Sequence, residues 1–304
     1  MMGNITLSVQ NLKKIIGKKE IIKGLTFDLK EGEVFGFLGP NGAGKTTTIR
    51  MLVGLIKPTS GSIKICGFNI ENSFQEAMGN LGCIVENPEL YPYLSGYDNL
   101  LHFSRMLEGI EENRIQEVTR LVGLSDRIHD KVKTYSLGMR QRLGIAQALL
   151  GRPKVLILDE PTNGLDPAGI REMREFIRFL AMDEGLTVLV SSHLLSEIQQ
   201  LCDRVAIISK GSIIKIDTVH DLLANRERVL WSFHPFEKGK EILSGLTTIE
   251  ENEDGTILTE FDEHLTPEWN RILVESGIFV IEMTRRMPVL EDLFLELTGG
   301  DSIE

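Results

Sequence analysis

Short apolar runs separated by glycine-bearing turns mark the opening part of the chain. The run at 33–38 is compact and apolar, so it predicts a buried strand. Glycines interrupt this run from residue 39, and helical character begins at residue 45. Further buried strands are predicted at 154–158 and 187–190. Strands that alternate with helices are typical of an α/β fold.

The middle of the chain has a different pattern. Residues 75–148 are predicted to be mostly helical, with breaks at two prolines and at Gly123. After this stretch a helix is predicted at 173–180, and a tight hairpin is predicted at 205–216.

The composition shifts again near Asn225, and both tryptophans lie beyond that point. We therefore expect a first domain at 1–224 and a small α+β accessory domain at 225–304. In the second domain Trp231 and Trp269 are expected to fill a small core. The predicted elements of the accessory domain are a strand at 229–233, a hairpin turn at 254–255, a helix at 267–276, a strand at 279–283 and a helix at 288–297 capped by the glycines at 299–300. No group of chemically reactive residues marks this domain, so we expect it to be a dimer-supporting or regulatory appendage.

Composition and charge narrow the class of protein. The 304 residues are 42% hydrophobic and 25% charged, which is typical of folded domains and excludes a collagen-like or disordered chain. The formal net charge is -11, so the chain lacks the basic surplus that nucleic-acid binding usually needs, and we expect no nucleic-acid partner. Cys66, Cys83 and Cys202 lie far apart and are expected to be reduced thiols. The apolar runs are much shorter than the roughly 20 residues of a spanning helix, and the first residues lack a signal-peptide pattern.

A phosphate-binding loop is the strongest local motif. Residues 39–46 match G-x-x-x-x-G-K-[ST] at every fixed position. Such a loop curls backbone N–H groups around phosphate oxygens, Lys45 is expected to reach the β- and γ-phosphates, and Thr46 to ligate Mg²⁺. The alternative, a glycine-rich turn with an incidental lysine, is disfavoured because a strand precedes the motif and a helix follows it. The expected nucleotide contacts are Gly39, Pro40, Asn41, Gly42, Ala43, Gly44, Lys45, Thr46 and Thr47.

Two acidic residues end the predicted strand at 154–158. If that strand is a parallel neighbour of the strand before the loop, Asp159 lies beside the loop and can hold the Mg²⁺ shell. Glu160 follows directly and is well placed to orient or deprotonate an attacking water. A solvated acidic strand end is the alternative, but the phosphate loop makes it the weaker one. These features indicate a P-loop nucleoside triphosphatase.

Three further passages resemble motifs of the ABC ATPases. Residues 135–142 resemble the signature motif of that family, 160–167 its passage from Walker B to the D-loop, and 191–193 its switch histidine. With matching order and spacing, the motifs span about residues 7–216. The resemblance implies an ABC ATPase core, a mixed sheet flanked by helices, with a helical subdomain at about 86–150. It also implies ATP and Mg²⁺ as cofactors.

The signature passage predicts a second anion site. Ser136 is a good N-cap for the following helix, and with Gly138 nearby the helix start offers N–H donors to an anion. In the family, two copies pack head to tail and each signature closes over the γ-phosphate of the other copy. The resemblance also gives His193 a hydrogen bond to the γ-phosphate and gives Asp166 a link between the two sites. By itself, the passage from Ser136 would be a plain helix start.

The sequence departs from the family at several positions. Most members have a glutamine where this chain has Glu86, whose carboxylate could still ligate Mg²⁺. The aromatic residue that often stacks on adenine is replaced by Ile15 and Ile16, and the signature has Leu137 and Met139 at two usual positions. In three features, namely Glu86, the signature residues 135–139 and the extra tail, the chain is similar to the exporter cassettes for bacitracin and lantibiotic immunity.

This resemblance implies an ATP-hydrolysing subunit of an exporter, with a membrane permease and a second copy of the chain as partners. The expected location is cytoplasmic, on the inner face of the membrane, with membrane contact through the permease only. Tyr91 and Tyr93 lie among prolines at 88–94 and are expected either to receive a permease helix or to pack locally. Two alternatives remain open: a soluble ABC ATPase that acts on ribosomes or nucleic acid, and an import subunit.

Overall fold

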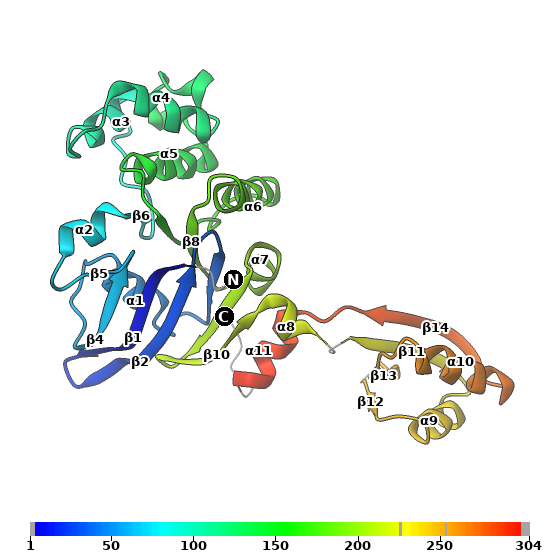
Figure 1. Cartoon of the computed structure of the whole chain (residues 1–304). Coiled ribbons are helices and arrows are strands. Elements are labelled where there is room, and N and C mark those ends of the chain that lie inside the picture. The colour runs from blue at the N-terminus through cyan, green and yellow to red at the C-terminus, as the bar shows by residue number, and fades with distance from the viewer. Residues whose placement is uncertain (1–3, 225–226, 253, 299–304) are drawn as a thin grey trace. The chain divides into compact units, whose positions relative to one another are not determined.

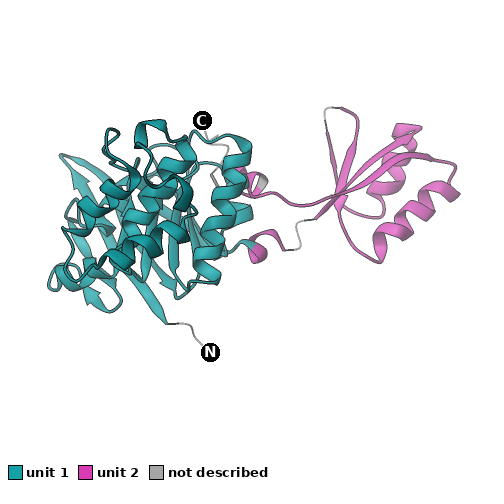
Figure 2. Ribbon diagram, turned by 90° about the horizontal axis from the view of Figure 1, so that it is seen from above, with its two compact units in different colours: residues 1–219, 297–304 teal, residues 220–296 magenta. Residues whose placement is uncertain are grey.

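A computed structural model describes residues 4–224, 227–252 and 254–298. The chain divides into two compact units, which Figure 2 distinguishes by colour. The first unit comprises residues 1–219 and 297–304, and the second comprises residues 220–296. The assignment of a catalytic domain and an accessory domain with a boundary near Asn225 stays a prediction.

A six-stranded sheet is the centre of the first unit, with strand order β10-β9-β3-β8-β7-β6. All neighbouring strands are parallel except β9 and β10, which pair antiparallel. Strands β3, β7 and β8 are buried along their whole length, as expected for strands of a sheet that is covered on both faces. The predicted strands and the predicted hairpin are confirmed. The bounds are β3 (Val34–Leu38), β6 (Leu81–Ile84), β7 (Val155–Asp159), β8 (Thr187–Ser192), β9 (Arg204–Ser209) and β10 (Ser212–Thr218).

Two features of this sheet differ from the sequence predictions. Strand β6 lies inside the stretch that the pattern predicted to be mostly helical. The pattern does not reveal this strand, because four residues are too few to display a period. Strand β8 lies between β3 and β7, so the strand that ends at Asp159 is not the direct neighbour of the strand before the loop. Strand order depends on contacts between distant parts of the chain, which local sequence patterns do not contain.

A second, antiparallel sheet has the order β2-β1-β4-β5. Its two long strands contain twelve residues each, more than the short runs that the pattern suggested. Bulges interrupt their pairing near Leu12, which hides the regular alternation of a long strand. Phe27 of this sheet packs on Phe35 and Phe37 of β3, so the two sheets share one core. The bounds are β1 (Ile5–Ile16), β2 (Lys19–Lys30), β4 (Ser60–Ile65) and β5 (Phe68–Asn69).

Helices surround the sheets, and three of them gather at one end of the first unit (Figure 1). This group consists of α3, α4 and α5 and lies within the predicted helical subdomain. Ser95 and Asp98 form a reciprocal capping box that starts α3. Asp166 caps α6, where Pro167 occupies the first turn. The bounds are α1 (Lys45–Leu52), α2 (Phe74–Gly79), α3 (Gly96–Ser104), α4 (Glu112–Leu121), α5 (Leu137–Leu149), α6 (Pro167–Met182) and α7 (Leu195–Leu201). The next helix, α8 (Val219–Leu223), belongs to the second unit except for its first residue.

The second unit contains an antiparallel sheet with strand order β12-β13-β11-β14. Trp231, Trp269 and Leu273 are buried in its core, as the sequence predicts for the tryptophans. The indole N–H of Trp231 donates to Thr259 Oγ1 at 2.9 Å, so the buried polar atom is paired. The bounds are β11 (Arg228–His234), α9 (Phe236–Ser244), β12 (Ile249–Glu251), β13 (Ile257–Glu260), α10 (Leu265–Glu275), β14 (Phe279–Arg286) and α11 (Leu290–Thr298). The predicted glycine cap at 299–300 lies outside the described residues.

Among the helices of the described residues, none combines the length and the apolar character that crossing a bilayer requires.

Candidate nucleotide-binding site

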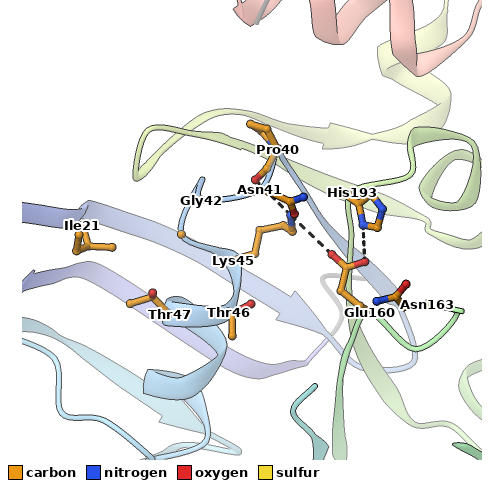
Figure 3. A pocket seen from close by; sticks show the side chains of 11 residues that line it. Ile21, Pro40, Asn41, Gly42, Lys45, Thr46, Thr47, Glu160, Asn163 and His193 are labelled. Carbon is orange, nitrogen blue, oxygen red and sulfur yellow. Dashed lines mark hydrogen bonds and ion pairs between the residues drawn. The ribbon is translucent and has the colours of Figure 1, made fainter. Parts of the chain in front are cut away.

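A cavity of about 440 Å³ opens where β3 passes through the glycine loop into α1 (Figure 3). Most of the predicted loop contacts line it, but Gly39 and Ala43 do not. Two lining residues come from the neighbouring strand ends, Glu160 after β7 and His193 after β8. The lining residues are Ile21, Pro40, Asn41, Gly42, Gly44, Lys45, Thr46, Thr47, Glu160, Asn163 and His193.

The shape of the loop requires glycine at specific positions. A Cβ at Gly39 would lie 2.4 Å from the carbonyl oxygen of Ile208, a distance that only backbone movement could relieve. Gly44 has a φ of 109° and forms the N-cap of α1, a conformation that residues with a Cβ rarely adopt. The N-terminus of α1 therefore points its free N–H groups and the positive end of its dipole into the cavity.

Lys45 places a buried ammonium group inside the loop. Its Nζ donates a hydrogen bond to the carbonyl of Gly39 at 2.6 Å and lies 3.8 Å from Glu160 Oε1. Burial lowers the pKa of Lys45, and the nearby carboxylates of Glu160 and Asp159 partly oppose that shift. An anion that enters the cavity would therefore meet an ammonium group that the loop already holds in place.

Glu160 lies between Lys45 and His193 at the cavity wall. One carboxylate oxygen faces Lys45, and the other lies 2.7 Å from His193 Nδ1 (Figure 3). The backbone N–H of Glu160 is fixed by Ser191, whose hydroxyl oxygen accepts from it at 3.0 Å. Glu160 has a φ of 51°, so the chain turns sharply there and directs the carboxylate toward the loop. The predicted catalytic residues Lys45, Glu160 and His193 are thus brought together.

Asp159 lies behind these groups at the end of β7. Its side chain is buried, and its Oδ1 accepts a hydrogen bond of 2.5 Å from the hydroxyl of Ser191. No group of three or more histidine, cysteine, aspartate or glutamate side chains in the described residues could hold a metal ion by itself. The donors near the loop, the Thr46 hydroxyl and the Asp159 carboxylate, fit Mg²⁺, which usually takes one or two protein ligands together with phosphate oxygens and water.

Glu86, the third predicted magnesium ligand, lies elsewhere. It does not line the cavity, and its carboxylate pairs with Arg50 of α1 at 2.5 Å on an exposed surface. Its φ of 65° makes it one of the few residues with a side chain in the left-handed region. A metal-binding role for Glu86 stays a prediction, and the geometry assigns it an ion pair with the helix that follows the loop.

The signature residues line a second, separate cavity of about 400 Å³. Ser136 caps α5, as predicted, and its hydroxyl accepts from the backbone N–H of Met139 at 3.2 Å. Gly138 lines the same cavity, as does Asp166 at the start of α6. Within one copy of the chain, the predicted anion site at the signature is therefore distinct from the loop cavity.

Sequence reasoning missed two residues of the loop cavity. Asn163 follows Glu160 by three positions and lines the wall beside it. Ile21 of β2 also lines the cavity, whereas Ile15 and Ile16, the expected aliphatic surface for the base, do not. The motif around Glu160 was a usable signal for Asn163. No local signal marks Ile21, because its position depends on the pairing of β1 with β2.

Comparison with known proteins decides the family. A family model described as ABC transporter matches residues 22–163. The chain is 50% identical to the ABC transporter ATP-binding protein YdbJ of Bacillus subtilis, over 100% of this chain and 98% of the relative. It is 42% identical to the bacitracin transport ATP-binding protein BcrA of Bacillus licheniformis, over 98% of each chain. The chain belongs to the ABC transporter ATP-binding proteins.

A solved structure supports the same fold. The chain resembles cbiO1 of Clostridium perfringens, part of the ABC transporter complex cbiONQ, with a TM-score of 0.67 and 27% identity over 73% of this chain and 92% of that chain. As an ABC transporter ATP-binding protein, the chain is an ATPase of a transporter complex. The predicted ABC ATPase fold and the predicted resemblance to bacitracin-type cassettes are confirmed.

Proposed function

We propose that this ABC ATPase powers an exporter of peptide antibiotics or related drugs. The observation that supports hydrolysis most strongly is the Glu160 carboxylate, which lies between the Lys45 ammonium and the His193 ring at the wall of the loop cavity. The identity with BcrA extends over nearly the whole of both chains, including the tail. This extent favours transport of a similar class of compound over the ribosome-directed and import alternatives.

Each residue near the loop then has a role. The backbone N–H groups of the loop at 39–47, in which Pro40 has none, and the Lys45 ammonium bind the phosphates and stabilise the charge that develops on them. Glu160 accepts a proton from the attacking water, and the His193 ring, whose Nδ1 lies 2.7 Å from that carboxylate, orients it. Thr46 and Asp159 would hold Mg²⁺, which when bound neutralises phosphate charge.

Two copies of the chain are proposed to complete the site. In a single copy the cavity that Ser136 lines is separate from the loop cavity, so this helix N-terminus can serve the phosphate of a second copy. A head-to-tail pair would place each signature over the opposite loop, with the permease holding the pair at the inner face of the membrane.

The exporter proposal predicts a cellular phenotype. Bacteria that express this chain with its permease should tolerate more bacitracin or lantibiotic than bacteria that express the permease with the Glu160→Gln variant. The measurement is the inhibitory concentration of each compound at equal protein levels. Equal inhibitory concentrations for both strains, across a panel of peptide antibiotics, would contradict the exporter proposal.

The surface around Tyr93 is the proposed contact with the permease. Tyr93 is 65% exposed, whereas Tyr91 is 37% exposed and packs on Tyr93, His102 and Phe103. Tyr91 therefore combines local packing with exposure, and Tyr93 offers the larger free surface. We expect Tyr93→Ala to reduce co-purification of the permease severalfold, since exposed aromatic residues often dominate interfaces.

The matched control is Phe68→Ala, which removes an exposed aromatic side chain from β5. This variant should co-purify the permease as well as the unaltered chain does. Full permease recovery with Tyr93→Ala would reject docking at this surface.

A further inference from the structure

Glu197 of α7 is a buried carboxylate that the proposed mechanism leaves without a role. The residue is 7% exposed and does not line the loop cavity. Its Oε2 accepts a hydrogen bond of 2.5 Å from Thr162 Oγ1 and another of 3.1 Å from Ser192 Oγ. Among the described residues, its Oε1 is buried and has no hydrogen-bond partner. Because burying a carboxylate is costly, an incompletely paired one calls for an explanation.

The two hydroxyls that Glu197 holds come from different loops of the active site. Thr162 lies in the turn after β7, and Ser192 is the last residue of β8. Each is followed directly by a residue of the cavity wall, Asn163 in the first case and His193 in the second. One carboxylate oxygen therefore links the backbone segments that carry both wall residues.

Hydrogen bonds hold Ser192 in place, and Ser192 in turn fixes the position of the adjacent His193. Its hydroxyl donates to Glu197 and accepts from the backbone N–H of Leu194 at 2.9 Å, so hydrogen bonds fix the backbone on both sides of His193. The separate contacts of Ser191 fix Asp159 and the backbone of Glu160 without help from Glu197. Loss of Glu197 would thus release His193 and Asn163 while Glu160 stays in place.

We propose that Glu197 is a positioning residue for ATP hydrolysis, whose carboxylate ties the Thr162 and Ser192 hydroxyls together and so keeps the His193 ring on the Glu160 carboxylate. The inference rests on the hydrolytic site proposed above. One carboxylate oxygen can accept two hydrogen bonds at once, so a single side chain can hold both hydroxyls in register. Phosphate binding belongs to the glycine loop and Lys45, so it does not depend on Glu197.

The test measures steady-state ATP hydrolysis and ATP affinity of the full-length chain. Glu197→Ala is expected to lower kcat about 10- to 100-fold, since a displaced catalytic group costs rate more than binding. The dissociation constant for ATP should change by less than about threefold. Glu197→Gln keeps an oxygen that accepts both hydroxyls, so its kcat should remain within about fivefold of the unaltered chain.

A double-mutant cycle separates positioning from general damage. In a His193→Ala background, Glu197→Ala should reduce kcat by less than about threefold further, because the group that it positions is already absent. Glu184→Ala changes an exposed glutamate two residues after the end of α6; it is the control and should behave like the unaltered chain. Thermal unfolding of each variant shows whether it is folded.

Four results would overturn the proposal: an unchanged kcat in Glu197→Ala, an equal loss with and without His193, a parallel loss of ATP affinity, or a Glu197→Gln variant as slow as Glu197→Ala. Hydrolysis by the unaltered chain and its loss in Glu160→Gln are measured alongside. If those two results fail, the proposed hydrolytic site is wrong. If they hold and the Glu197 results fail, only the positioning role is wrong.

Discussion

Replacing Glu160 with glutamine is expected to remove most ATP hydrolysis and to leave ATP binding intact. The amide cannot accept the proton of the attacking water, and loss of a general base typically costs about 100- to 10,000-fold in rate. Glutamine has nearly the same shape and still accepts a hydrogen bond, so the contact with His193 Nδ1 can be kept. Steady-state phosphate release and equilibrium ATP titration measure the two quantities.

Glu184→Gln is the matched control for this prediction, since it makes the same chemical change at an exposed site. It should hydrolyse ATP at the rate of the unaltered chain. If Glu160→Gln turned over ATP just as fast, Glu160 would not be the base and the proposed chemistry would need another carboxylate.

Lys45→Ala is expected to weaken ATP binding itself. The ammonium group is buried inside the loop, and each hydrogen bond between a charged donor and phosphate contributes about 1.5–3 kcal/mol. The loss therefore corresponds to about a 10- to 100-fold higher dissociation constant. Burial also lowers the pKa of Lys45, so the folded chain disfavours this charge, and removing it should not destabilise the fold.

Calorimetric titration with ATP measures this effect, and Lys64→Ala serves as the control because Lys64 is an exposed lysine on β4. The control variant should bind ATP normally. An unchanged affinity in Lys45→Ala would remove Lys45 from the phosphate site, whereas reduced affinity in both variants would indicate only a general effect of lost positive charge.

Local motifs predicted the centre of the site well. The loop from Gly39 to Thr46 has a shape that its own glycines dictate, and a strand before it and a helix after it are enough to place Lys45. The acidic end of β7 and the histidine after β8 were also predictable, because the carboxyl ends of parallel strands lie at the same edge of a sheet.

Features that depend on distant contacts were not predictable in this way. The insertion of β8 between β3 and β7, the entry of Ile21 into the cavity and the pairing of Glu86 with Arg50 all depend on how separate segments meet. Glu197 is a further example, since no local sequence signal distinguishes it from the other polar residues of α7. Its meaning comes only from the hydroxyls of Thr162 and Ser192, which the fold brings to it.

The proposed hydrolysis depends most on one shared site, in which the glycine loop of one copy and the Ser136 helix of a second copy enclose a single ATP. The most direct measurement is a crystal structure of the full-length Glu160→Gln variant with ATP and Mg²⁺. The account predicts two copies head to tail, with the phosphates of each ATP between Lys45 of one copy and Ser136 of the other. Separate copies, or phosphates bound away from the loop at Gly39–Thr46, would contradict it.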